Sequence, residues 1–466
     1  MLAALFAMKL IALTRLPLLR SRRNRLPGGE SLPPPNVASP HPVSSATPGR
    51  PEPPTSEQSK RVPTLWLIAV ISTIAVVLRF VCVWIGISHF GVKAVYGGFE
   101  PAFVGAALAN GHGFSSLYGV PSGPTAWLAP IYPLIVGVTF KFFHNYSTGA
   151  AWCLFSLNIL CETLTAILLY WIGRCCFNPM VAFAGALLWA VDWSTALYSV
   201  RIWESSISAL LATLSIVWYL YLIDTLPRKR DWIAYGAFWG IVALVNTTLV
   251  LMMPLAVAVL WYRWKRKLQW PAILALTVFA VTLTPWTVRN YIVFHKVIPV
   301  RGNFGPNLWY GNHPDVLSPR DESLDPTQNT DELHDYVRLG ESQYARSRQL
   351  MALQFIRQNP ARFVRLTRNR IAFFWAAGLG ADRPALGSAI WSLLAFTGVL
   401  LILRNKPINA AVFAASLLFY PIPYYLTLAE AFYRHPIDPI MTILVVYACF
   451  TLAELVMPAK AETRLR

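Results

Sequence analysis

The sequence predicts an all-α polytopic membrane protein, with a transmembrane helical bundle and a small, mostly helical region outside the bilayer. Of the 466 residues, 55% are hydrophobic and only 13% are charged, and the mean hydropathy is +0.46. Apolar stretches of about 20 residues, the length that crosses a bilayer as a helix, recur along the chain. So much apolar surface exceeds what one soluble core buries, so we expect a membrane protein.

Charge and cysteine content exclude two other classes. The formal net charge is +18, but the Lys and Arg residues lie in short clusters between apolar stretches, where the positive-inside rule explains them. We therefore expect membrane lipids as surroundings and no nucleic acid as a partner. The six cysteines show neither a metal-ligand spacing nor a disulfide pattern. The sequence thus requires no cofactor, although it leaves a divalent metal open.

Changes in composition divide the chain into five regions. Residues 1–63 combine a basic run with a Pro/Ser-rich stretch, which predicts a disordered cytosolic arm. We expect the other regions to be an N-terminal transmembrane module with a first outer loop at 89–149, a periplasmic region, C-terminal transmembrane helices and a cytosolic tail. Their bounds are 64–288, 289–384, 385–457 and 458–466.

Hydropathy predicts about ten to twelve membrane spans. The spans that can be delimited are 64–88, 150–173, 179–198, 205–224, 232–246, 247–262, 270–288, 385–403, 408–428 and 436–457. The two between 232 and 262 are short, and one long tilted helix is the alternative there.

The basic clusters predict that both termini are cytoplasmic, and this constrains residues 127–143. A full crossing there would put the later basic loops on the wrong side. The segment is short, has Pro130 and Pro133 near its start and has Lys141 near its end. We therefore expect it to dip into the membrane or lie in its plane. All the candidate chemistry then falls on one face.

Glu100 is the first candidate on that face. It precedes Pro101 in a short helix-like stretch beyond the first span. A carboxylate half out of water there can have its pKa raised toward that of a general base. The alternative is an acid that only complements the helix dipole.

Arg201 and Glu204 lie three residues apart where one span ends and the next begins, and Asp192 lies in the same region as an acid near the end of a span. Such a guanidinium can bind an anionic group, and intramembrane acids are functional candidates by default. The alternative is an ion pair that anchors the interface.

The periplasmic region begins with a run rich in amide and aromatic side chains. Such side chains bind sugar hydroxyl groups and the C–H faces of sugar rings, but they also occur in ordinary turns and interface belts. Further along, Arg434 and His435 precede the last span and either contact a phosphate or mark the interface. The candidates in the first run are Arg289, Arg301, Asn303, Trp309 and Asn312.

Taken together, these motifs resemble the GT-C superfamily of polyprenyl-phosphate-sugar glycosyltransferases, in its protein O-mannosyltransferase-like and aminoarabinose-transferase-like bacterial branch. The resemblance covers residues from about Leu65 to Met457. It rests on Glu100, the Pro-rich run 124–133, Tyr198–Glu204, the Pro285–Tyr291 motif, Phe355–Pro360 followed by Phe374–Trp375, and Tyr433–Pro436. One departure is that many members carry an Asp or two adjacent acids where this chain has the single Glu100.

The resemblance implies an inverting glycosyltransferase of the bacterial inner membrane, with Glu100 as the catalytic base. Because no soluble nucleotide-sugar domain is visible, the implied donor is a sugar on polyprenyl (undecaprenyl) phosphate. The implied acceptor is a hydroxyl of lipid A, a protein or a cell-envelope glycan. Expected donor-phosphate ligands are Arg201, Arg289, Arg434 and His435, and expected substrate-binding residues are Glu204, Asp192, Arg301, Asn303, Trp309 and Asn312.

Two other functions remain open. A transporter or flippase of lipid-linked sugars would need similar arginines and aromatic side chains, but the sequence lacks the internal repeats typical of transporters. A scaffold for envelope assembly would be indifferent to substitution of Glu100.

Overall fold

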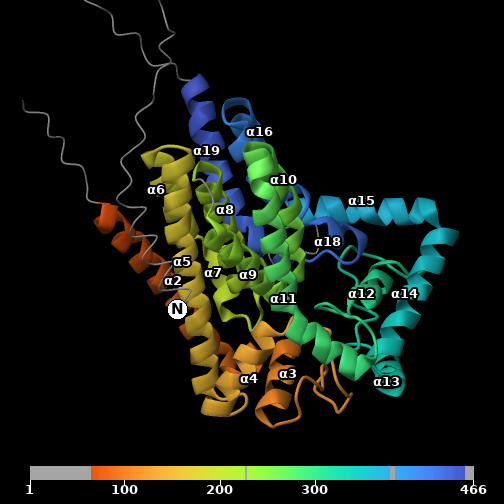
Figure 1. Cartoon of the computed structure of the whole chain (residues 1–466). Helices are drawn as coiled ribbons and strands as arrows, with labels where there is room; N and C mark the ends of the chain where they lie inside the picture. Colours follow the sequence, from red (N-terminus) through yellow and green to blue (C-terminus); the bar gives the residue numbers. More distant parts are fainter. Residues whose placement is uncertain (1–63, 226–227, 378–383, 457–466) are drawn as a thin grey trace, which may run out of the picture. The chain divides into compact units, whose positions relative to one another are not determined.

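The computed structural model describes residues 64–225, 228–377 and 384–456. The predicted N-terminal arm and cytosolic tail lie outside these residues. The described chain is helical and has no strand beyond two isolated bridges, Ser115–Pro124 and Ala377–Pro384. The all-α membrane fold is therefore confirmed (Figure 1).

Among the described residues, eight helices are long and apolar enough to cross a membrane, or nine if one bent pair counts as a span. Six are α2 (Thr64–Tyr96), α5 (Thr148–Cys176), α8 (Ser205–Asp224), α11 (Gln269–Phe294), α16 (Leu386–Asn405) and α19 (Asp438–Val456), the last preceded by η4 (Ala431–Ile437). The others join η2 (Thr247–Met252) to α10 (Met253–Trp264) and α17 (Pro407–Leu418) to α18 (Ile422–Leu426). The expected span at 232–246 corresponds to α9 (Lys229–Val245), which has 17 residues and is shorter than these eight helices.

The segment 229–264 forms two helices, not one long tilted helix. The backbone leaves the helical region at Asn246, between α9 and η2. Asn246 Nδ2 donates to Ser208 Oγ at 3.2 Å, near the start of α8. Trp264 Nε1 donates to the carbonyl of Leu222 at 3.0 Å, near the end of α8. Asn246 thus lies beside the start of α8, and the end of α10 lies beside the end of α8. The chain therefore turns back at Asn246.

The expected span at 179–198 is broken. It consists of α6 (Pro179–Val191), α7 (Trp193–Ala196) and the 3-10 turn η1 (Leu197–Val200), with a bend of 52°. Asp192 interrupts the helix with a ψ of 108°, and its Oδ1 accepts a bond from Ser194 N at 2.9 Å, which caps α7.

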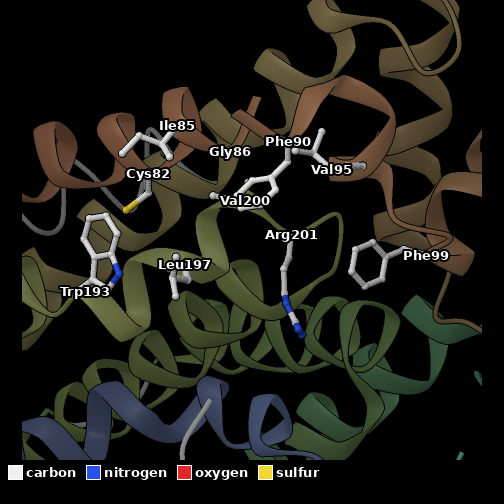
Figure 2. Close-up of a pocket in the computed structure, with 11 residues that line it drawn as sticks. Cys82, Ile85, Gly86, Phe90, Val95, Phe99, Trp193, Leu197, Val200 and Arg201 are labelled. Carbon is white, nitrogen blue, oxygen red and sulfur yellow. The ribbon is translucent and has the colours of Figure 1, made fainter. Parts of the chain in front are cut away.

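The bend brings η1 against α2, as Figure 2 shows for Val200 and Gly86. A Cβ at Gly86 would lie 2.7 Å from Cγ1 of Val200, so only glycine permits this approach. Further along, α2 bends at Gly91, whose φ of 79° favours glycine.

The first outer loop contains α3 (Glu100–Ala109) and α4 (Ile131–Phe143), which pack against each other. At 13 residues, α4 is about 20 Å long, too short for a bilayer. It starts directly after Pro130, in agreement with the expected in-plane or dipping segment.

Between α11 and α16 the chain forms α12 (Phe304–Gly311), α13 (Thr330–Leu339), α14 (Glu341–Gln358) and α15 (Pro360–Ala376). In Figure 1, α15 runs across the direction of the long helices. Its end meets the start of α16, where Ala385 N donates to the carbonyl of Ala376 at 2.7 Å.

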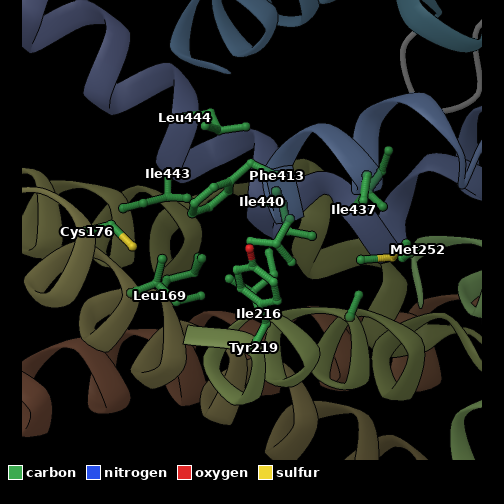
Figure 3. Packing of buried hydrophobic residues seen from close by; sticks show 14 of the residues in the cluster. Leu169, Cys176, Ile216, Tyr219, Met252, Phe413, Ile437, Ile440, Ile443 and Leu444 are labelled. Carbon is green, nitrogen blue, oxygen red and sulfur yellow. The ribbon is translucent and has the colours of Figure 1, made fainter. Parts of the chain in front are cut away.

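The largest hydrophobic cluster lies inside the helical bundle. Leu169, Ile216, Phe413 and Ile440 come from four different helices and are all fully buried (Figure 3). Tyr219 lies among them, and its hydroxyl donates to the carbonyl of Ile408 at 2.7 Å. This rigid interior positions the helix ends that form the candidate site.

Candidate functional site

An apolar groove of about 480 Å³ lies between α2 and the segment α7–η1 (Figure 2). Its lining includes Cys82, Ile85, Phe90, Phe99, Leu197 and Val200. Arg201 is the one charged residue among the described side chains that line it. The groove therefore suits a long apolar group that ends in an anion.

Three aromatic rings surround the guanidinium of Arg201. Its Cζ lies 4.6 Å from the ring centroid of Phe432, 5.8 Å from that of Tyr198 and 5.9 Å from that of Phe99. Burial lowers the pKa of Arg201, while Tyr198 and Glu430 act in the opposite direction. Within the described part of the chain, this guanidinium makes no hydrogen bond or ion pair. Its donors thus remain available to a ligand.

Glu100 begins α3, directly after the groove residue Phe99. Its side chain is only partly exposed. Burial, helped by the negative charge of Asp325, raises the pKa of Glu100 to about 7, and Arg301 acts in the opposite direction. A carboxyl group with this pKa can accept a proton near neutral pH.

Arg301 connects three segments beside Glu100. Its Nη1 lies 3.6 Å from Oε1 of Glu204 at the start of α8, and its Nε donates to the carbonyl of Trp127 at 3.1 Å. Burial raises the pKa of Glu204, and Arg301 opposes this. The structure therefore brings together three of the predicted site residues, Glu100, Glu204 and Arg301.

Sequence analysis missed an ion pair in the same neighbourhood. Nε of Arg320 lies 2.8 Å from Oε1 of Glu430, and the charges of both residues influence Arg201. Burial raises the pKa of Glu430 to about 8, although Arg320 and Arg201 act against this. The Arg320–Glu430 pair thus adds charged groups beside Arg201. The position of Glu430 in the polar loop before the last span could have identified it as a site residue from the sequence. No comparable sequence feature marks Arg320 or Asp325.

Two of the predicted phosphate ligands, Arg289 and Arg434, donate hydrogen bonds to groups of this chain. Nη1 of Arg289 donates to the carbonyl of Thr125 at 2.8 Å, and its Nη2 donates to that of Phe114 at 3.0 Å. Nε of Arg434 donates to Asp438 at 2.9 Å, and its Nη1 contacts the carbonyl of Phe374. Their guanidinium groups hold loops in place in this structure, and a role as phosphate ligands stays a prediction.

Three further candidates also make framework contacts. His435 is fully buried, and its Nε2 lies 2.8 Å from Oε1 of Glu162. Asp192 caps α7 through Ser194. Asn312 donates through Nδ2 to the carbonyl of Leu426 at 2.8 Å and accepts from Arg370.

Asn303 and Trp309 lie at the start and within α12. Asn303 is partly exposed and does not cap the helix with its side chain. Trp309 is mostly buried, and its Nε1 has no hydrogen-bond partner. Their sugar-binding role stays a prediction.

The described donor groups give no candidate metal site. No group of three or more His, Cys, Asp and Glu side chains in the described ranges is arranged to hold a metal ion. The presence or absence of a divalent metal stays an expectation from the sequence.

A family model described as dolichyl-phosphate-mannose-protein mannosyltransferase matches residues 127–288. This match includes Arg201 and Glu204 but starts after Glu100. No curated protein matches the chain significantly.

Solved structures of the oligosaccharyltransferase from the archaeon Archaeoglobus fulgidus resemble this chain. Its complex with an inhibitory peptide and a dolichol-phosphate has a TM-score of 0.52 at 12% identity, covering 84% of this chain and 50% of that one. The apo form gives 0.51 at 13% identity, covering 84% and 51%. The form tethered to an acceptor peptide gives 0.51 at 12% identity, covering 84% and 50%.

The fold of this chain is similar to that of the archaeal enzyme, and about a third of the chain matches the mannosyltransferase family model. At these identities the likeness shows the fold alone, and the chain spans about half the length of the enzyme it matches. Within this fold, the apolar groove is lined by one charged residue, Arg201, and by Phe99, which directly precedes Glu100 in the chain.

Proposed function

We propose that this protein is an inverting glycosyltransferase of the GT-C superfamily that moves a sugar from polyprenyl phosphate, in bacteria undecaprenyl phosphate, to an acceptor hydroxyl. The observation that carries the proposal is an apolar groove with one charged residue in its lining. Arg201 is that residue, and Phe99 in the same lining directly precedes Glu100 in the chain. A lipid chain suits the apolar lining, its phosphate suits the cation, and the reaction at the attached sugar needs a carboxylate.

In this proposal the isoprenoid chain occupies the groove and its phosphate meets Arg201. Charge-assisted hydrogen bonds from a guanidinium suit a phosphate, and the unused donors of Arg201 supply them. Arg320 adds a second positive charge near Arg201. Both cations then stabilise the negative charge that develops on the departing phosphate.

Glu100 acts as the general base. The acceptor oxygen attacks the anomeric carbon from the face opposite the phosphate and gives its proton to the carboxylate. The new bond joins the acceptor oxygen to that carbon, and the bond between the carbon and the phosphate oxygen breaks. A pKa of about 7 leaves a large ionised fraction of Glu100 at neutral pH. Arg301 and Glu204 border the space for the sugar.

The structural neighbours support a lipid-linked donor. The archaeal oligosaccharyltransferase has been solved with a dolichol-phosphate and, separately, with a tethered acceptor peptide. The acceptor of this chain is left as one of three classes: a lipid, a protein or an envelope glycan.

Charge supports a periplasmic active site in the inner membrane, with cytoplasmic termini. Arg263 and Lys406 lie near Asp224, at the end of α8 opposite Glu204. Lys406 also donates to the carbonyl of Cys176 at the end of α5, at 2.9 Å. Basic loops thus gather at the end of the bundle away from the site, as expected for a cytosolic face.

Mass spectrometry of the purified protein tests the reaction. The protein is incubated with a panel of polyprenyl-phosphate sugars and with lipid, peptide or glycan acceptors. We expect an acceptor to gain the mass of one sugar with wild type and with Asp331→Asn, an exposed carboxylate-to-amide control, but not with Glu100→Gln. Donor binding without transfer from any donor would refute the proposal and favour a flippase, which liposome translocation of labelled donor would then reveal.

A further inference from the structure

Three ionisable side chains meet in the interior of the bundle, away from solvent. Arg79 of α2, Glu162 of α5 and His435 of η4 each have a side chain that is 0% exposed. Oε2 of Glu162 lies 3.7 Å from Nη2 of Arg79, and its Oε1 lies 2.8 Å from Nε2 of His435. Burying such groups costs free energy, so an ionisable cluster inside a membrane protein points to a functional role.

Arg79 holds the break in the span that leads to Arg201. Its Nη1 donates to the carbonyl of Ala190 at 3.1 Å, and its Nη2 donates to that of Trp189 at 3.1 Å. These carbonyls lie in the last turn of α6, where the bend removes helical donors. Nη2 also contacts Oγ1 of Thr195 in α7 at 3.4 Å. The guanidinium therefore stabilises the direction in which α7 and η1 leave α6.

His435 supports the other side of the same site. Its ring stacks on that of Tyr198 with centroids 3.8 Å apart, and Tyr198 lies 5.8 Å from the guanidinium of Arg201. Phe432, which belongs to η4 like His435, lies 4.6 Å from that guanidinium. Both ends of the buried cluster thus lead to the aromatic rings around Arg201.

We propose that Arg79, Glu162 and His435 form a positioning network that fixes the aromatic surroundings of Arg201 and so sets the affinity for a lipid phosphate. Glu162 joins the two halves because its carboxylate lies between the broken span and η4. His435 is therefore a positioning residue behind Tyr198 and not a phosphate ligand. The inference rests on the proposed role of Arg201, although it does not require that transfer occurs.

Equilibrium binding of undecaprenyl phosphate to the purified protein tests the network. We expect His435→Gln and Glu162→Gln each to raise the Kd about tenfold, a typical coupling for neighbouring residues, equal to about 1.4 kcal/mol. In an Arg201→Gln background the same substitutions should raise the Kd by less than about twofold, because the network acts through Arg201. Equal effects in both backgrounds would overturn the inference.

Matched variants separate positioning from general stability. Tyr219→Phe removes a buried hydroxyl bond elsewhere in the bundle. It should lower Tm without changing the Kd. If His435→Gln does not fold, Tyr198→Leu removes the ring between the network and Arg201 and should raise the Kd in the same Arg201-dependent way. A Kd for Tyr198→Leu equal to that of wild type would overturn the inference.

Transfer kinetics distinguish this inference from the proposed function. With sugar-loaded donor, the network variants should raise the donor KM and leave kcat and the acceptor KM near wild type. Absence of transfer by wild type, with phosphate binding and its Arg201 dependence retained, would refute only the proposed function. A loss of kcat with unchanged donor affinity would refute only the positioning network.

Discussion

The ionisation of Glu100 should control the pH dependence of transfer. Burial and Asp325 together raise its pKa to about 7. A general base acts only when ionised, and the ionised fraction is about one-tenth at pH 6, one-half at pH 7 and nine-tenths at pH 8. We therefore expect kcat/KM to fall about tenfold from pH 8 to pH 6. Glu100→Gln should lower kcat by about 10²- to 10⁴-fold and remove this ionisation from the profile.

A second substitution tests the electrostatic origin of this pKa. The negative charge of Asp325 raises the pKa of Glu100, so Asp325→Asn should move the acid limb of the kcat/KM profile to lower pH. Initial rates of sugar transfer between pH 5.5 and 9 in a constant-ionic-strength buffer measure both effects, and Asp331→Asn serves as the exposed control. A Glu100→Gln enzyme that keeps the acid limb, or an Asp325→Asn limb shifted to higher pH, would refute the reasoning.

Three further substitutions probe the groove, its cation and the loop beside it. Arg201→Gln should weaken undecaprenyl phosphate binding about 10- to 100-fold, as expected when a charge-assisted bond is lost, with Tm unchanged; an unchanged Kd would contradict the assignment. Ala94→Trp should fill the groove and weaken long-chain donors while a short-chain soluble analogue binds as before; equal losses for both would argue against a lipid groove. Glu341→Ala removes the acceptor of bonds from Ala126 N and from the hydroxyls of Thr125 and Tyr336, so unfolding free energy should fall by about 3 kcal/mol; a Tm within 1 °C of wild type would exclude this role.

The regular part of the fold could be predicted because hydropathy is a local property of the sequence. The span expected at 205–224 coincides with α8. Likewise, α4 starts after Pro130 and stays short, as the prolines and Lys141 in 127–143 indicated. These features depend on residue composition over one or two turns and on the length of a bilayer crossing.

The bend at Asp192 could not be predicted, because its cause lies far away in the sequence. Residues 179–198 are apolar enough to form one straight span. The carbonyls freed at the bend are bound by Arg79, which is 111 residues from Ala190. Since Arg201 follows this bend, its position depends on that distant contact. No periodicity or motif in the local sequence carries the information.

The same limit applied to the choice among arginines. Arg201, Arg289 and Arg434 all lie near span ends beside aromatic residues, so their local sequences make all three equally good candidates for phosphate ligands. Tertiary structure separates them, because Arg289 donates to the carbonyls of Thr125 and Phe114 and Arg434 donates to Asp438. Whether a guanidinium has free donors depends on which loop reaches it.

The surroundings of Arg201 are the strongest physical argument for a ligand site. A folding chain normally satisfies the donors of a partly buried guanidinium, as the carbonyls around the buried Arg370 illustrate. Around Arg201 the chain supplies rings instead, which attract the cation through their faces but accept no strong hydrogen bonds. Glu430, an acid whose charge influences Arg201, forms its ion pair with Arg320 and not with Arg201. The unpaired cation is therefore costly to the apo protein, and a bound phosphate would recover that cost.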